Sequence, residues 1–255
     1  MSVLILSSHV ATSDVGGSAQ VVAFARAGIE TVFAPTVLFG RHPGLGAPGG
    51  GPVGAEVFAG MLEGIAAAGV LMTLDAVITG YFASAEQVAI AARALDAARA
   101  ASPGVRIIVD PIMGDHGKGL YVDPAVADAI VADLVPRADL IAPNAWELER
   151  LTGHAISDPA TALVAARSLG KAVLVSSVAV GDEIGVVYAE GREAWLASHA
   201  RQSSAPNGTG DRLTALFTIE RLGGTPPDAA LRTSVKAVAE MATGAPVAVR
   251  VTRWT

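Results

Sequence analysis

The sequence contains no cysteine and has few aromatic and few charged residues. The absence of cysteine from all 255 residues excludes disulfides, thiolate nucleophiles and zinc sites with cysteine ligands, and it favours a cytoplasmic location. Charged residues make up only 16% and the net charge is −6, so no basic surface for nucleic acid is expected. The start of the chain has no apolar run of membrane-spanning length and no basic flank typical of a signal peptide, so we expect no membrane association.

Apolar residues make up 51% of the chain, enough for one substantial core, and we expect a single domain over 1–255. Short β-rich apolar runs occur at 3–7, 31–37, 76–79, 107–110, 140–142, 172–176 and 185–189. They are interleaved with alanine-rich stretches at 18–27, 53–68, 84–101, 159–169 and 211–222 that favour helices. This alternation predicts an α/β fold: a mostly parallel central sheet with helices on both faces. Ligands of such sheets bind beyond the carboxyl ends of the strands, where Ser8, Asp110, Asn144 and Ser176 lie.

The segment 40–54 interrupts this pattern because glycines alternate with prolines along it. Such a composition is incompatible with a regular helix or strand, so the segment is predicted to be a glycine-rich loop. Two interpretations remain open: a surface loop without a role in binding, or a mobile cover over a ligand site.

The motif Asn207-Gly208-Thr209-Gly210-Asp211 opens the helical stretch 211–222. Glycines at a helix start leave the backbone N–H groups accessible, and the helix dipole attracts negative charge to them. A phosphoryl group in transfer is such a charge, and Asp211 could take the proton from an acceptor hydroxyl. The alternative is that Asp211 only complements the helix dipole.

Two further polar clusters follow apolar runs. Asp110 and Asp115 bracket Asp110-Pro111-Ile112-Met113-Gly114-Asp115 and could hold Mg²⁺ beside phosphates, or Asp110 could cap a turn. Asn144 and Glu147, in Pro143-Asn144-Ala145-Trp146-Glu147, are three residues apart, a spacing that also fits a helix capping box.

Together the Asp110–Gly114 run, Pro143-Asn144 with Glu147, and Gly208–Asp211 resemble the ribokinase-like superfamily over nearly the whole chain. Its pyridoxal kinase branch is the most similar one. The narrower resemblance is carried by Ser8-His9-Val10, Gly16 to Ala19, Thr36-Val37-Leu38-Phe39 with His42, Thr79-Gly80-Tyr81, and Gly119-Leu120-Tyr121-Val122.

The resemblance implies an ATP-dependent pyridoxal kinase acting in vitamin B6 salvage. Asp211 would be the base that activates the 5′-hydroxymethyl group, and the amides of Gly208, Thr209 and Gly210 would form an anion hole. Ser8 would form a hydrogen bond with the pyridine ring, and the substrate pocket would be shaped by Thr36, His42, Pro43 and Tyr81.

For the second substrate, the resemblance implies that Asp110, Asn144, Glu147 and Ser176 organise the phosphates of ATP together with Gly208, Thr209 and Gly210. Asp110, Asp115 and Glu147 would hold Mg²⁺. A monovalent cation such as K⁺ and a homodimer are further features that the resemblance implies.

The chain departs from the family in the substrate loop. His42-Pro43 stands where the family typically has His-Thr, which removes a hydroxyl and a backbone donor. A kinase of the same fold that acts on hydroxymethylpyrimidine or a related heteroaromatic alcohol is one alternative function. The other, which the departure at Pro43 motivates, is a non-catalytic vitamin or nucleotide binder, against which the intact Asp211 argues.

Overall fold

The structure is a computed structural model that describes residues 1–202 and 206–254. The chain divides into two compact units: an N-terminal unit of Met1–Gly114 and Lys118–Asp139, and a C-terminal unit of Asp115–Gly117 and Leu140–Thr255. The short strands β6 (Gly114–Asp115) and β7 (Gly119–Leu120) lie where the chain passes between the units. The single domain over 1–255 stays a prediction.

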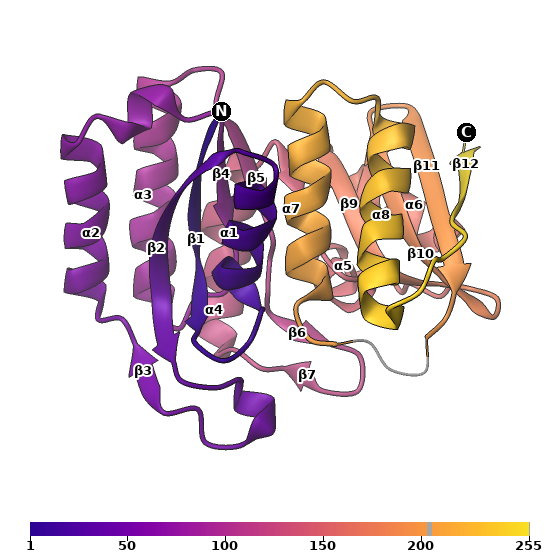
Figure 1. The fold of residues 1–255 in the computed structure, drawn as a ribbon, viewed down its shortest axis with the longest axis horizontal. Helices are drawn as coiled ribbons and strands as arrows, with labels where there is room; N and C mark the ends of the chain where they lie inside the picture. Colours follow the sequence, from indigo (N-terminus) through magenta and orange to yellow (C-terminus); the bar gives the residue numbers. More distant parts are fainter. Residues whose placement is uncertain (203–205, 255) are drawn as a thin grey trace. The chain divides into compact units, whose positions relative to one another are not determined.

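The N-terminal unit contains strands in the order β5-β4-β1-β2-β3. Four of them are parallel, β1 (Ser2–Val10), β2 (Glu30–Phe39), β4 (Ala76–Thr79) and β5 (Arg106–Val109), whereas β3 (Gly50–Pro52) runs antiparallel to β2. The helices are α1 (Gly16–Arg26), α2 (Ala55–Ala67), α3 (Ala85–Ala101) and α4 (Pro124–Ala129), with helical turns η1 (Pro43–Leu45), η2 (Val70–Thr73), η3 (Ile130–Leu134) and η4 (Val135–Arg137). Helix α1 packs on β1 and β2 (Figure 1).

The C-terminal unit contains strands in the order β12-β11-β10-β9-β8. Strands β8 (Leu140–Ile141) and β9 (Ala172–Val180) are parallel, and β10 (Glu183–Glu190), β11 (Glu193–Ala200) and β12 (Arg250–Trp254) continue as an antiparallel meander. The helices are α5 (Ala145–Thr152), α6 (Pro159–Ser168), α7 (Thr209–Leu222) and α8 (Pro227–Thr243).

Alternate residues of the C-terminal strands fill two hydrophobic clusters, one on each face. Leu174 of β9 and Tyr188 of β10 pack with Leu213 and Phe217 of α7 and with residues of α8. Val173 and Val175 of β9 instead pack with residues of α5 and α6. Figure 1 shows α7 and α8 side by side in front of these strands and α6 behind them. Both faces of the sheet are therefore covered.

The predicted α/β fold with a mostly parallel sheet is confirmed, and every predicted strand and helix is present with ends shifted by a few residues. Asp110 lies just beyond the end of β5 rather than inside it. The antiparallel β11 and β12 and the long helix α8 were not predicted.

The prediction that residues 40–54 form no regular element is wrong. The segment contains η1, and Gly50–Pro52 form β3, which pairs with Val37–Phe39. Glycines 49 and 50 have φ of +64° and +79°, so they turn the chain back toward β2 at little steric cost. Strand β3 is at the edge of its sheet, where the missing N–H of Pro52 breaks no ladder.

No helix in residues 1–202 or 206–254 is both long and apolar enough to cross a bilayer.

Candidate functional site

Ser8 lies near the carboxyl end of β1, at an irregular point of the sheet. Ser7 pairs with Pro35 and His9 with Leu38, so two residues of β2 face Ser8 alone. Gly16, with φ of +56°, packs so close that a Cβ atom there would lie 2.0 Å from Ser8 Oγ. Only glycine fits at this contact, which explains why glycines follow the first strand.

The turn after β4 is fixed by two hydrogen bonds to other elements, and a third bond holds Thr36 itself. The buried Thr36 hydroxyl donates to the carbonyl of Tyr81 at 2.6 Å, and the N–H of Tyr81 donates to Ser7 Oγ at 3.3 Å. Gln87 Nε2 donates to the carbonyl of Thr36 at 2.9 Å. Burial raises the pKa of Tyr81, so its phenol is neutral at physiological pH. Thr36 thus acts on this turn through the backbone of Tyr81.

His42 caps the helical turn η1, and Pro43 occupies the first position of that turn. The N–H of Gly44 donates to His42 Nδ1 at 3.0 Å, so the ring is neutral at that nitrogen. Partial burial and the charge of Lys118 lower the pKa of His42, which favours the same neutral form. Proline is suited to this position because its fixed φ matches the turn and its missing N–H would have no partner there.

The two aspartates of the second cluster have different surroundings. Asp110 is buried, its N–H donates to the carbonyl of Thr79 at 3.0 Å, and it belongs to the N-terminal unit. Asp115 is half-buried and accepts the N–H of His116 at 2.7 Å. In the described part of the chain, no three His, Asp or Glu side chains gather as a metal cage. Magnesium is commonly held by one or two carboxylates with phosphates and water, so its site stays a prediction.

Asn144 and Glu147 form a complete capping box at the start of α5, as one of the two sequence interpretations expects. The N–H of Glu147 donates to Asn144 Oδ1 at 2.9 Å, and the N–H of Asn144 donates to Glu147 Oε2 at 2.8 Å. Glu147 is only 3% exposed. Its carboxylate therefore stabilises the start of α5. A role of the same carboxylate in binding a ligand stays a prediction.

Helix α7 begins without a side-chain cap. Gly208, the N-cap residue, has φ of +84°, which a residue with a side chain rarely adopts. A Cβ atom on Gly210 would meet no described atom within 4 Å, so packing does not require glycine there. The space it leaves, beside N–H groups without intrahelical partners, fits a bound anion. Asp211 is half-buried in the same turn.

Three of the segments that carry predicted site residues lie at one edge of the C-terminal sheet. Ala142, just past the end of β8, belongs to the same cluster as Leu213, two residues beyond Asp211. Asn144 and Ser176 form a bridge in which the N–H of Ser176 donates to the carbonyl of Pro143 at 2.9 Å. The structure thus brings the starts of α5 and α7 and the Ser176 segment to the carboxyl edge of β8 and β9.

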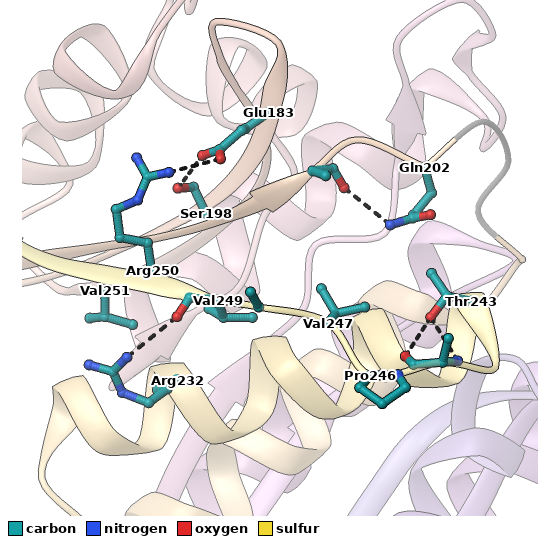
Figure 2. Close-up of a pocket in the computed structure, with 13 residues that line it drawn as sticks. Glu183, Ser198, Gln202, Arg232, Thr243, Pro246, Val247, Val249, Arg250 and Val251 are labelled. Carbon is teal, nitrogen blue, oxygen red and sulfur yellow. Dashed lines mark hydrogen bonds and ion pairs between the residues drawn. The ribbon is translucent and has the colours of Figure 1, made fainter.

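A groove of about 690 Å³ is present in the C-terminal unit, between the ends of α8 and β11 and the segment leading into β12 (Figure 2). Glu183 lines one wall of the groove, where it accepts a hydrogen bond from Ser198 Oγ at 2.6 Å and forms a salt bridge with Arg250 at 3.1 Å. Gln202, at the other end, precedes the segment that leads to Gly208. The sequence gives no signal for this groove, because its lining residues are scattered from 183 to 251.

Gln87 is the clearest residue that sequence reasoning missed. It is 1% exposed and donates from Nε2 to the carbonyls of Thr36 and Val53, while its Oε1 accepts the N–H of Ala83. The pattern Ser84-x-x-Gln87 is a capping-box signature and could have identified it.

Comparison with known proteins agrees with this arrangement. A family model described as phosphomethylpyrimidine kinase matches residues 46–250. The pyridoxal kinase of Deinococcus radiodurans is 36% identical over 230 residues, which are 85% of this chain and 77% of the relative. The pyridoxine/pyridoxal/pyridoxamine kinase of Bordetella avium is 34% identical over 240 residues, covering 91% and 81%.

Solved structures agree with the fold. Pyridoxal kinase from Leishmania donovani in complex with ADP superposes with a TM-score of 0.88 at 25% identity, covering 95% of this chain and 86% of that one. Pyridoxal kinase from Entamoeba histolytica has a TM-score of 0.92 at 23% identity, over 99% of both chains, which supports the fold alone. The fold and the uncapped start of α7 define a small-molecule kinase of the ribokinase-like class. Within that class, the chain belongs to the phosphomethylpyrimidine kinase family, among its pyridoxal kinases.

Proposed function

We propose that the protein transfers the γ-phosphoryl group of ATP to the 5′-hydroxymethyl group of pyridoxal, which yields pyridoxal 5′-phosphate in vitamin B6 salvage. One observation carries this function: α7 opens with a left-handed Gly208, a Gly210 that packing does not require, no side-chain cap and a carboxylate in the same turn. Relatives named pyridoxal kinases cover most of the chain, which supports the choice of acceptor.

In the proposed mechanism, Asp211 accepts the proton of the 5′-hydroxyl as its oxygen attacks the γ-phosphorus. The bond to the β,γ-bridging oxygen breaks and ADP leaves. The N–H groups of Gly208, Thr209 and Gly210 stabilise the negative charge on the transferring group, and the dipole of α7 adds to this effect. The position of Asp211 in the same turn as these amides supports both roles.

We assign the pyridine ring to residues of the N-terminal unit. Ser8 hydrogen-bonds the ring, Tyr81 and Thr36 shape its pocket, and His42 and Pro43 line it from the glycine-rich loop. The support is local: Thr36 holds the backbone of Tyr81, and a neutral His42 with Nδ1 engaged keeps Nε2–H as a donor.

The nucleotide is assigned to Asn144, Ser176, the amides of α7 and the groove of Figure 2, which would take the nucleoside. Ser198, Gln202 and Thr243 line the groove, and α8, which ends at Thr243, packs against α7. Asp110, Asp115 and Glu147 would hold Mg²⁺, which neutralises phosphate charge. We propose a monovalent cation such as K⁺ as a further cofactor.

The decisive experiment is an ADP-release assay with pyridoxal, pyridoxine, pyridoxamine and hydroxymethylpyrimidine as acceptors. We expect the highest kcat/KM with pyridoxal. A preference for hydroxymethylpyrimidine would favour the alternative kinase, which the description of the family model motivates. Binding of pyridoxal without ADP release from any acceptor would favour the non-catalytic binder.

We also propose that the protein works in the cytoplasm as a homodimer. Sedimentation at micromolar concentration measures the assembly directly, and a monomer at the concentration of the assay would remove the dimer from the proposal.

Thr36→Val is expected to lower the free energy of unfolding by about 1–3 kcal/mol, because the Tyr81 carbonyl loses its buried donor. It should also raise KM for pyridoxal more than KM for ATP, since Tyr81 belongs to the ring pocket. Thr36→Ser keeps the hydroxyl and is the matched control. Thermal unfolding and steady-state kinetics test both effects, and a uniform change in both KM values would contradict the assignment of Tyr81.

Pro43→Thr is expected to tighten pyridoxal binding by about 0.5–1.5 kcal/mol if the restored hydroxyl makes one neutral hydrogen bond to the ligand. We propose that residues 40–54 close over the ring and exclude water. Calorimetry measures the affinity, and hydrogen exchange with and without pyridoxal measures the closure. An unchanged affinity, or equal protection in both states, would show that the segment does not cover the substrate.

A further inference from the structure

Ser177 is the one non-glycine residue with a positive φ, +61°, in residues 1–202 and 206–254. A left-handed backbone costs an L-residue free energy because Cβ crowds the following carbonyl oxygen. Such residues persist where surrounding structure holds them, often beside functional sites. The conformation of Ser177 therefore needs a reason.

The reason begins with a β-bulge in β9. Val175 pairs with Val187 and Val178 pairs with Gly185, so Ser176 and Ser177 together face only Val186. A bulge shifts the alternation of side chains by one residue. Val175 and Val178 consequently lie in the same hydrophobic cluster, although they are three positions apart and a regular strand would place them on opposite faces.

The bulge also lies at the carboxyl edge of the C-terminal sheet. Its first residue, Ser176, donates its N–H to the carbonyl of Pro143, directly before the capping box of Asn144 and Glu147. Beside the bulge, a Cβ atom on Gly185 would lie 2.7 Å from Val180 Cγ2, so the chain packs closely there. Ser177 thus directly follows Ser176, whose hydrogen bond to Pro143 links β9 to the start of α5.

We infer that Ser177 is a positioning residue for nucleotide binding, acting through its left-handed backbone. By turning β9 at this point, it holds Ser176 against Pro143 and so fixes the Asn144–Glu147 cap at the edge where α7 begins. The identity of the nucleotide as ATP rests on the proposed function. The hydroxyl of Ser177 is not required, so any residue that tolerates a left-handed backbone should replace it.

The experiment compares substitutions that accept this backbone with one that does not. Ser177→Gly and Ser177→Asn, which tolerate positive φ, should keep Kd for ATP within about twofold of the parent. Ser177→Val should raise Kd and KM for ATP about tenfold, because its β-branch disfavours the competent backbone, while KM for pyridoxal stays within about twofold. Ala179→Val, at an exposed position of β9 beyond the bulge, is the matched control and should leave both constants unchanged.

A purely structural bulge would give a different result. If Ser177→Val lowered Tm but kept the parent's affinity for ATP, or raised both KM values equally, the inference would be overturned. If that variant did not fold, Ser177→Thr, which also has a β-branch, would provide the same comparison. Calorimetry with ATP needs no acceptor, so a parent inactive on pyridoxal would refute the proposed function while the Ser177 series still tested this inference.

Discussion

Asp211→Asn is expected to lower kcat by roughly 10²–10⁴, the usual effect of losing a general base. The substitution is nearly isosteric and keeps α7 with its N–H groups, so the fold and the affinity for ATP should be retained. Steady-state kinetics and calorimetry with ATP measure the two quantities on the same preparation.

The matched control is Asp228→Asn, because Asp228 also lies in the first turn of a helix, α8. A carboxylate that only complements a helix dipole contributes about 0.3–1 kcal/mol to stability and nothing to chemistry. Asp228→Asn should therefore keep the parent kcat. If Asp211→Asn also kept a kcat close to that of the parent, Asp211 would only complement the helix dipole, and the mechanism would have to be abandoned.

Glu147→Gln is expected to weaken the binding of ATP in the presence of Mg²⁺ by about 10–100-fold, the range found for groups that support a metal site. Glutamine can still accept the N–H of Asn144, so the capping box and the stability of α5 should persist. The variant thus removes the charge and keeps the cap. Calorimetry with and without Mg²⁺, together with thermal unfolding, separates the two tasks of this side chain.

The matched control for this variant is Asp158→Asn, because Asp158 caps α6 in a similar box with Thr161 and is not assigned to a ligand. It should leave the affinity for ATP unchanged. If Glu147→Gln bound ATP equally well with and without Mg²⁺ at the parent's affinity, Glu147 would have only its structural task.

Local sequence determined the helix starts with good accuracy. The glycines of Gly208-Thr209-Gly210-Asp211 indicated a helix start with accessible N–H groups, and a capping box was one of the two interpretations of the spacing of Asn144 and Glu147. Both features depend on residues within one helical turn, so neighbours in sequence are neighbours in space. The parallel strands were predicted for a related reason, since a strand buried on both faces is a continuous apolar run.

Features that depend on strand pairing were beyond the sequence. Nothing in Val175-Ser176-Ser177-Val178 indicates a bulge, because its position depends on the register of β9 against β10. Likewise, Gly50–Pro52 became a strand only because the edge of β2 offered unpaired partners.

The sequence by itself determined the fold class, the family and the helix start that carries Asp211, because short-range chemistry and a resemblance over nearly the whole chain specify them. Only the tertiary structure decided the left-handed backbone of Ser177, the buried bonds of Gln87 and the groove beside α8. These features arise where segments far apart in the chain must hydrogen-bond each other's backbone groups and pack together without gaps. No local sequence pattern specifies such contacts.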